Sequence, residues 1–137
     1  MNYLWWALFS VLAYALVAPL VSIATSDIPS EVVVVTTNGI LFVTAAALLV
    51  FSDVSVSGYL VHESAQYMYA AGVLLAVAIV AYYRALELGP VSVVAPIFGT
   101  FFVLSAIIGI VFLEEPFTLR KGLGVVLAGV AIWLVSG

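Results

Sequence analysis

The sequence predicts an all-α membrane protein with five transmembrane helices, short loops and no soluble domain. Of its 137 residues, 66% are hydrophobic and 7% are charged, against roughly 45–50% and about 25% in soluble domains. The few charged residues stand between long apolar runs rather than within them. Because lipid offers no hydrogen bonds to the backbone, continuous apolar runs of this length predict helices rather than strands.

The same composition excludes several classes of function. Three Lys and Arg residues are too few for nucleic-acid binding, and the absence of Cys excludes a disulfide scaffold. The single His, His62, lies beside Glu63 in a polar segment, and neither a metal site nor a catalytic constellation is apparent. We therefore expect no enzyme activity, no cofactor and no bound metal.

The expected spans are set by the places where charged and turn-forming residues interrupt the apolar runs. A hydrocarbon core of about 30 Å needs roughly 20 residues of helix. The turn at Pro29 ends the first run, the polar segment 52–66 (with Asp53) the second, Arg84 the third, and the loop 114–118 the fourth. The expected spans are residues 4–24, 32–51, 67–84, 91–113 and 119–135, all in one domain over 1–137.

The link between the third and fourth spans is short enough to specify their arrangement. Glu87 and Leu88 lead to Gly89, which suits a helix C-terminus, and Pro90 suits the first position of the next helix. The third and fourth spans should therefore form an antiparallel hairpin. Two alternatives remain open: four spans with one helix in the membrane interface, and a cleavable signal peptide, although Met1-Asn2-Tyr3 has no basic residue.

Basic residues near the span ends predict a weakly determined orientation. Five spans place the N-terminus, segment 52–66 and loop 114–118 on one side, with Arg120 and Lys121 close by, and Arg84 on the other side. Two basic residues against one favour a cytoplasmic N-terminus. So small a difference also allows insertion in both orientations.

Prolines and small residues indicate where the helices bend and pack. Pro19 and Pro96 interrupt the first and fourth spans, and each should kink its helix by removing one backbone hydrogen bond. Small residues let helices approach closely in lipid. Gly72 lies four residues before Ala76 in the third span, and such pairs favour close helix contact. In the fifth span Gly122 and Gly129, seven residues apart, are the expected dimer-packing positions.

Polar side chains within the spans are the candidates for contacting a solute. Asn38 lies about 9 Å into the second span and should face the bundle, because an amide is expensive to place against lipid. Its alternative role is an interhelical hydrogen bond of about 1 kcal/mol. The other candidates are Ser10 and Tyr14 in the first span, Thr37 in the second, Tyr82, Tyr83 and Arg84 in the third, and Ser92 and Thr100 in the fourth.

Three of these positions have competing interpretations. Tyr82 and Tyr83 either close a cavity or belong to the aromatic belt at the membrane interface. Arg84 either contacts an anionic solute or pairs with Glu87, three residues further along the same helix. In the following loop, Glu115 is expected to stabilise the start of the fifth helix, where negative charge is favoured.

The C-terminal part of the chain carries a recognisable pattern. It reads Tyr-Tyr-Arg-Ala-Leu-Glu-Leu-Gly-Pro-Val-Ser-Val-Val-Ala-Pro over 82–96, followed by Leu113-Glu114-Glu115, Thr118, and then Gly122, Gly129 and Val130. This pattern resembles the EamA-type domain of the drug/metabolite transporter superfamily. The resemblance covers residues 82–131 and is one of hydropathy alone before that. The first span has no acidic residue, unlike the related small multidrug exporters, so their proton exchange is not implied.

The resemblance implies half of an inverted-repeat ten-helix transporter. Most members contain two five-span domains of opposite orientation, and this chain has one. It would therefore pair as an antiparallel homodimer with dual topology, or with a separate half-transporter. The implied function is export or facilitated passage of a small neutral or amphipathic metabolite across the plasma membrane by alternating access. The alternative is a membrane accessory subunit or assembly scaffold that transports nothing.

Overall fold

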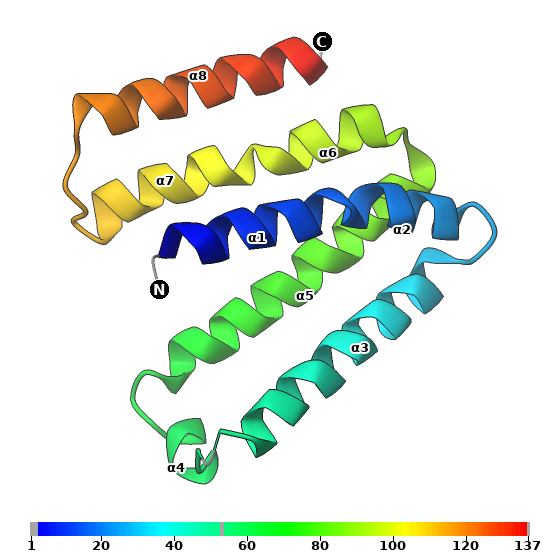
Figure 1. Cartoon of the computed structure of the whole chain (residues 1–137), viewed down its shortest axis with the longest axis vertical. Helices are drawn as coiled ribbons and strands as arrows, with labels where there is room; N and C mark the ends of the chain where they lie inside the picture. The colour runs from blue at the N-terminus through cyan, green and yellow to red at the C-terminus, as the bar shows by residue number, and fades with distance from the viewer. Residues whose placement is uncertain (1–2, 53, 137) are drawn as a thin grey trace. The chain divides into compact units, whose positions relative to one another are not determined.

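The chain forms helices over almost all of the part that the structure describes. A computed structural model describes residues 3–52 and 54–136 (Figure 1), so Asp53 lies outside the described residues. The helices are α1 (Tyr3–Ala15), α2 (Val17–Thr25), α3 (Ser30–Val50), α4 (Ser57–Leu60), α5 (Ala65–Leu88), α6 (Val91–Gly99), α7 (Phe101–Phe112) and α8 (Leu119–Ser136). The predicted all-α class is confirmed.

Four helical stretches among the described residues are long and apolar enough to cross a membrane. They are Tyr3–Thr25, Ser30–Val50, Ala65–Leu88 and Val91–Phe112. They coincide with the first four predicted spans, and the chain is a multi-pass membrane protein. The fifth predicted span forms a helix, α8, of 18 residues. That α8 crosses the membrane stays a prediction.

The first span is divided in two near Pro19. α1 ends at Ala15 and α2 begins at Val17. At the break the Leu16 N–H donates to the Ala13 carbonyl at 3.3 Å, a three-residue bond instead of the four-residue bond of an α-helix. Pro19 has no N–H to offer the Ala15 carbonyl, and its ring crowds that carbonyl. The interruption therefore falls on the N-terminal side of the proline.

The fourth span is divided at Thr100, four residues after Pro96. The Thr100 hydroxyl donates to the Ile97 carbonyl at 2.7 Å, and the Thr100 N–H donates to the same carbonyl at 3.1 Å. A Thr side chain that bonds back to the preceding turn competes with the backbone ladder and bends a helix. Pro96 lies inside α6, on the far side of this division from α7, so the structure ties the division to Thr100.

Two loop predictions need correction. α5 continues one turn past Arg84 to Leu88, which leaves Gly89 and Pro90 as the link to α6. Helix-forming residues continue up to Gly89, and a residue that precedes proline disfavours the helical conformation. Segment 52–66, expected as a loop, contains the short helix α4.

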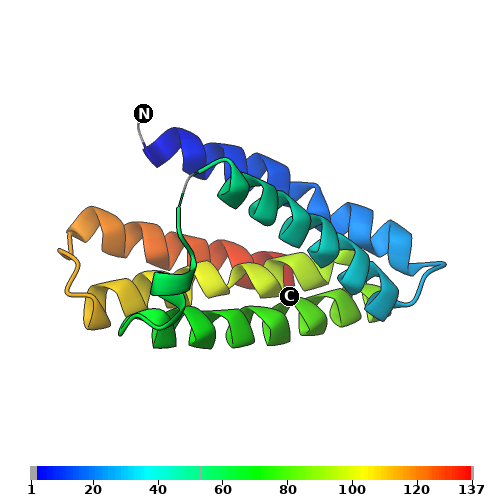
Figure 2. The ribbon, with the colours of Figure 1, turned by 90° about the horizontal axis from the view of Figure 1, so that it is seen from below.

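The described residues group into two compact units. The central unit is Pro19–Leu88, and the terminal unit combines the residues up to Ala18 with those from Gly89 onward. In the terminal unit α8 lies alongside α6 and α7 (Figures 1 and 2). In the central unit α3 packs against α5. Figure 2 shows α3 and α5 diverging from the end where α3 begins and α5 finishes.

Burial is concentrated at that end of the central unit. Its buried side chains there are Val21, Thr25, Ser30, Val33, Tyr82, Tyr83 and Leu86. Most other large apolar side chains of the spans are exposed, for example Phe42 and Leu74. Lipid tails solvate such side chains as well as a protein core does, so a membrane helix can leave them outward.

Candidate functional site

The divergence of α3 and α5 opens a groove between the two helices. Its volume is about 310 Å³. The lining residues are Val34 and Asn38 from α3, and Gly72, Leu75, Ala76, Ile79 and Val80 from α5. Concave sites of roughly 300–1,000 Å³ with a few polar groups are typical of small-molecule binding. This groove lies at the lower end of that range.

Small residues on α5 keep the groove open. A Cβ atom added at Gly72 would meet no atom within 4 Å. Ala76, one turn further along the helix, lines the same groove. The sequence interpretation of this pair as a close helix contact is wrong for the packing of α3 against α5. The two small residues here form a groove wall.

Asn38 supplies the polar group of this groove. All other described lining residues are aliphatic or glycine. The half-buried Asn38 donates from Nδ2 to the Val34 carbonyl of its own helix at 2.9 Å. Within residues 3–52 and 54–136, no other protein group hydrogen-bonds this amide. Its Oδ1 and one N–H are therefore available to a solute, since an amide carries two donors and an acceptor.

Two tyrosines lie at the end of the groove where α5 finishes. Tyr82 and Tyr83 are 6% and 5% exposed. Their rings meet edge to face, with centroids 6.3 Å apart. Burial to this degree fits side chains that fill the end of a cavity better than side chains of an interfacial belt, which contact the membrane surface. Their role in closing a cavity stays a prediction.

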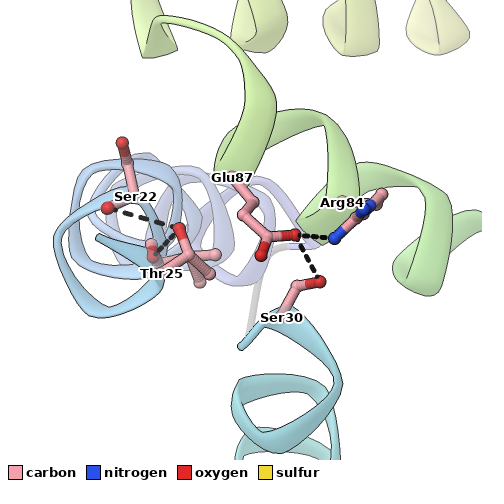
Figure 3. Close-up of polar contacts among 6 residues, drawn as sticks. Ser22, Thr25, Ser30, Arg84 and Glu87 are labelled. Atoms are coloured by element: carbon pink, nitrogen blue, oxygen red, sulfur yellow. Dashed lines mark hydrogen bonds and ion pairs between the residues drawn. The ribbon is translucent and has the colours of Figure 1, made fainter. Parts of the chain in front are cut away.

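Beyond the tyrosines, a carboxylate joins the two helices (Figure 3). Glu87 Oε2 accepts a hydrogen bond from the Ser30 hydroxyl at 2.8 Å. The same oxygen is paired with the Arg84 guanidinium, the helical spacing expected from the sequence. Sequence reasoning missed Ser30. The signal that could have found it is a serine placed directly after Pro29, at the start of a helix.

The remaining predicted solute contacts are not gathered at this groove. Thr37 lies on α3, but its hydroxyl donates to the Val33 carbonyl at 2.8 Å and does not line the groove. The other four candidates belong to the terminal unit: Ser10, Tyr14, Ser92 and Thr100. The Ser10 hydroxyl donates to the Ala7 carbonyl at 2.8 Å, and the Thr100 hydroxyl bonds its own helix as described above. Ser92 is exposed, and Tyr14 is half-exposed.

The two glycines expected at a dimer interface have different surroundings. A Cβ atom at Gly122 would come within 2.8 Å of the Phe117 ring, which belongs to the loop before α8. Gly122 therefore accommodates a side chain of its own unit. A Cβ atom at Gly129 would meet nothing within 4 Å. Of the two, Gly129 is the position with room for another helix.

The loop before α8 is held by polar contacts that differ in part from those expected. Glu114 has a φ of 53°, a left-handed conformation that non-glycine residues adopt rarely. The Glu115 carboxylate pairs with Lys121 Nζ at 3.6 Å. The capping acceptor is instead the Thr118 hydroxyl, which receives the Lys121 N–H at 3.2 Å. Both interactions stabilise the start of α8. Thr118 caps a backbone N–H, whereas Glu115 pairs with the charged Lys121 side chain.

A second groove, of about 370 Å³, lies between α7 and α8. The Glu115–Lys121 ion pair is part of its lining. Both charged side chains are about half exposed, and each already has the other as its partner. No group of three or more potential metal ligands occurs among the described residues.

Several apolar helices of spanning length define a multi-pass membrane protein. Comparison with known families agrees with this class. The model of the EamA-like transporter family matches residues 1–137, and the chain belongs to that family. The predicted membership of the drug/metabolite transporter superfamily is therefore confirmed. No curated protein and no solved structure matches the chain.

Proposed function

We propose that this chain carries a small neutral or amphipathic metabolite through the groove between α3 and α5. The observation that carries this proposal is the Asn38 amide. It lies within a membrane span, lines a groove that is otherwise apolar, and keeps unused hydrogen-bonding capacity. A polar group inside a membrane span is costly unless it is used, which favours a functional role.

The composition of the groove supports an uncharged solute. Its described lining contains no acidic or basic side chain. A charged solute would lose its hydration there without gaining a counter-charge. A partly apolar solute with one hydrogen-bonding group would match both the aliphatic walls and Asn38.

Alternating access by an antiparallel dimer completes the proposal. With α8 as a fifth span, the start of α1 and the end of α8 lie on opposite sides of the membrane. A copy inserted upside down then supplies the inverted repeat on which many transporters are built. The open face of α8 at Gly129 supports a helix contact there. We place the protein in the plasma membrane, with a separate half-transporter as the alternative partner.

Flux through proteoliposomes tests the transport proposal. We expect a screen of amino acids and other neutral metabolites to identify a solute whose flux falls roughly ten-fold in Asn38→Leu, the scale set by the loss of one hydrogen bond worth about 1.5 kcal/mol. The matched control is Thr44→Val, which removes an exposed hydroxyl from the same helix. Absence of flux for every solute, with the dimer intact, would favour the scaffold function. The hydroxyls that bond only their own helices, such as those of Ser10 and Thr37, are consistent with that alternative.

Labelling of single cysteines tests the orientation. Asp27→Cys and Ser55→Cys would place thiols on exposed residues at opposite ends of α3. In any one orientation, the thiols of the two variants therefore lie on opposite sides of the membrane. In a dual-topology population, we expect an impermeant reagent outside cells to modify about half of each variant. Modification of one variant alone would mean a single orientation and a separate half-partner.

A further inference from the structure

At one end, the α3–α5 groove is followed by buried side chains, which we call the sealing layer. Val33 on α3, with Tyr82, Tyr83 and Leu86 on α5, form this sealing layer, and Leu86 is only 2% exposed. The groove lining begins immediately below the layer, at Val34 on α3 and Val80 on α5. A solute beside Asn38 would therefore have these buried side chains between itself and this end of the helices.

A hydrogen bond ties the two helices together above the sealing layer. The Ser30 hydroxyl, on the first residue of α3, donates to Glu87 in the last turn of α5 (Figure 3). Ser30 is 4% exposed, and the Glu87 side chain is 21% exposed. A hydrogen bond to a carboxylate is stronger than one between neutral groups. Its position keeps the start of α3 against the end of α5.

Arg84 allows the hydrogen bond between Ser30 and Glu87 to break and re-form without leaving the Glu87 charge unpaired. The Arg84 guanidinium reaches the same Glu87 oxygen from the preceding turn of α5. When Ser30 moves away, Glu87 keeps its counter-charge on its own helix. Separation of the helices then breaks the bonding between Ser30 and Glu87 and leaves no unpaired charge. An unpaired charge would be costly near lipid.

We propose that the Ser30–Glu87 hydrogen bond is the latch of a gate. The gate opens when the start of α3 separates from the end of α5, which parts the sealing layer and exposes the groove to water at that end. Asn38 lies eight residues along α3 from Ser30, about 12 Å further along the helix axis. Ser30 and Glu87 do not touch the solute and act as positioning residues. The proposal rests on the transport function proposed above, but its test needs no solute.

The accessibility of residue 38 measures whether this gate exists. The chain has no native cysteine, so Asn38→Cys introduces a single thiol. The full chain would be reconstituted in liposomes and treated with a sulfonated, membrane-impermeant maleimide, with modification followed by mass spectrometry. We expect Ser30→Ala in this background to raise the rate roughly ten-fold, the scale set by the loss of one hydrogen bond to a charged group. Ser30→Ala leaves the Arg84–Glu87 pair in place.

Three further variants separate a latch from a general structural effect. Ser30→Thr retains the hydroxyl and should keep the rate low. Glu87→Gln retains a weaker acceptor and should raise the rate by less than Ser30→Ala does. Glu115→Gln removes a carboxylate from the ion pair of the terminal unit and should leave the rate unchanged. Thermal unfolding in detergent identifies any variant that has lost its fold.

Each other outcome contradicts a specific part of the proposal. If folded Ser30→Ala protein reacts no faster than its parent, the latch is wrong. If such a result accompanies flux that depends on Asn38, the gate is lost and the transport function stands. If the thiol at residue 38 is unreactive in every variant, water never reaches the groove, and both the gate and the pathway are overturned.

Discussion

Replacement of Gly72 by leucine is expected to reduce solute flux at least ten-fold while the protein remains folded. An added Cβ at Gly72 meets no atom within 4 Å, so the backbone accepts a side chain there. That side chain projects from the α5 wall of the groove that Asn38 lines. A leucine side chain would occupy space that the solute needs. It would also place hydrocarbon opposite Asn38, the amide proposed to hydrogen-bond the solute. Loss of both contacts corresponds to about 1–3 kcal/mol of discrimination.

Gly39 offers a matched control for this prediction. It is also a helical glycine within a span, and a Cβ atom there also meets nothing within 4 Å. It does not line the groove. Gly39→Leu carries the same change in volume and helix propensity and should retain flux. Flux measured in proteoliposomes at equal protein content makes the comparison, and equal flux in the two variants would place the pathway elsewhere.

Covalent closure of the latch is expected to stop transport. In Ser30→Cys/Glu87→Cys, a short bifunctional methanethiosulfonate would join the two helix ends that the native hydrogen bond holds together. With α3 and α5 unable to separate, the transporter loses one of the two states that alternating access requires. Flux should therefore disappear on cross-linking and return when the cross-linker is reduced.

The corresponding control is a cross-link that spares the gate. Glu115→Cys/Lys121→Cys joins two side chains of the terminal unit that already form an ion pair at 3.6 Å. Cross-linking this pair should leave most of the flux intact. Undiminished flux in protein cross-linked between residues 30 and 87 would show that solute passes without separation of these helix ends.

The sequence was most informative where the argument depended on composition alone. Transfer into lipid is close to additive over residues, so the apolar runs predict helices of spanning length without any knowledge of packing. The first four runs agree with the structure in this way. The pairing of Arg84 with Glu87 was also open to prediction, because it depends only on helical spacing. The predicted and observed ends of the third span differ by one helical turn, because α5 continues from Arg84 to Leu88.

The groove could not be predicted from the sequence because it depends on how two helices diverge. Gly72 and Ala76 favour a close helix contact when a span is considered alone. Next to α3 they form the wall of an open groove. Similarly, nothing in the sequence places Ser30 beside Glu87, since the two are 57 residues apart.

Residue order therefore determined that this chain lies in a membrane, where its helices run and which of their side chains are polar. Only the packing of α3 against α5 decided that Asn38 lines a groove and that Ser30 lies beside Glu87 at one end of the two helices. The reason is physical: hydropathy acts on each residue separately, whereas a groove and a latch depend on the distance between helix axes, which contacts between remote residues set.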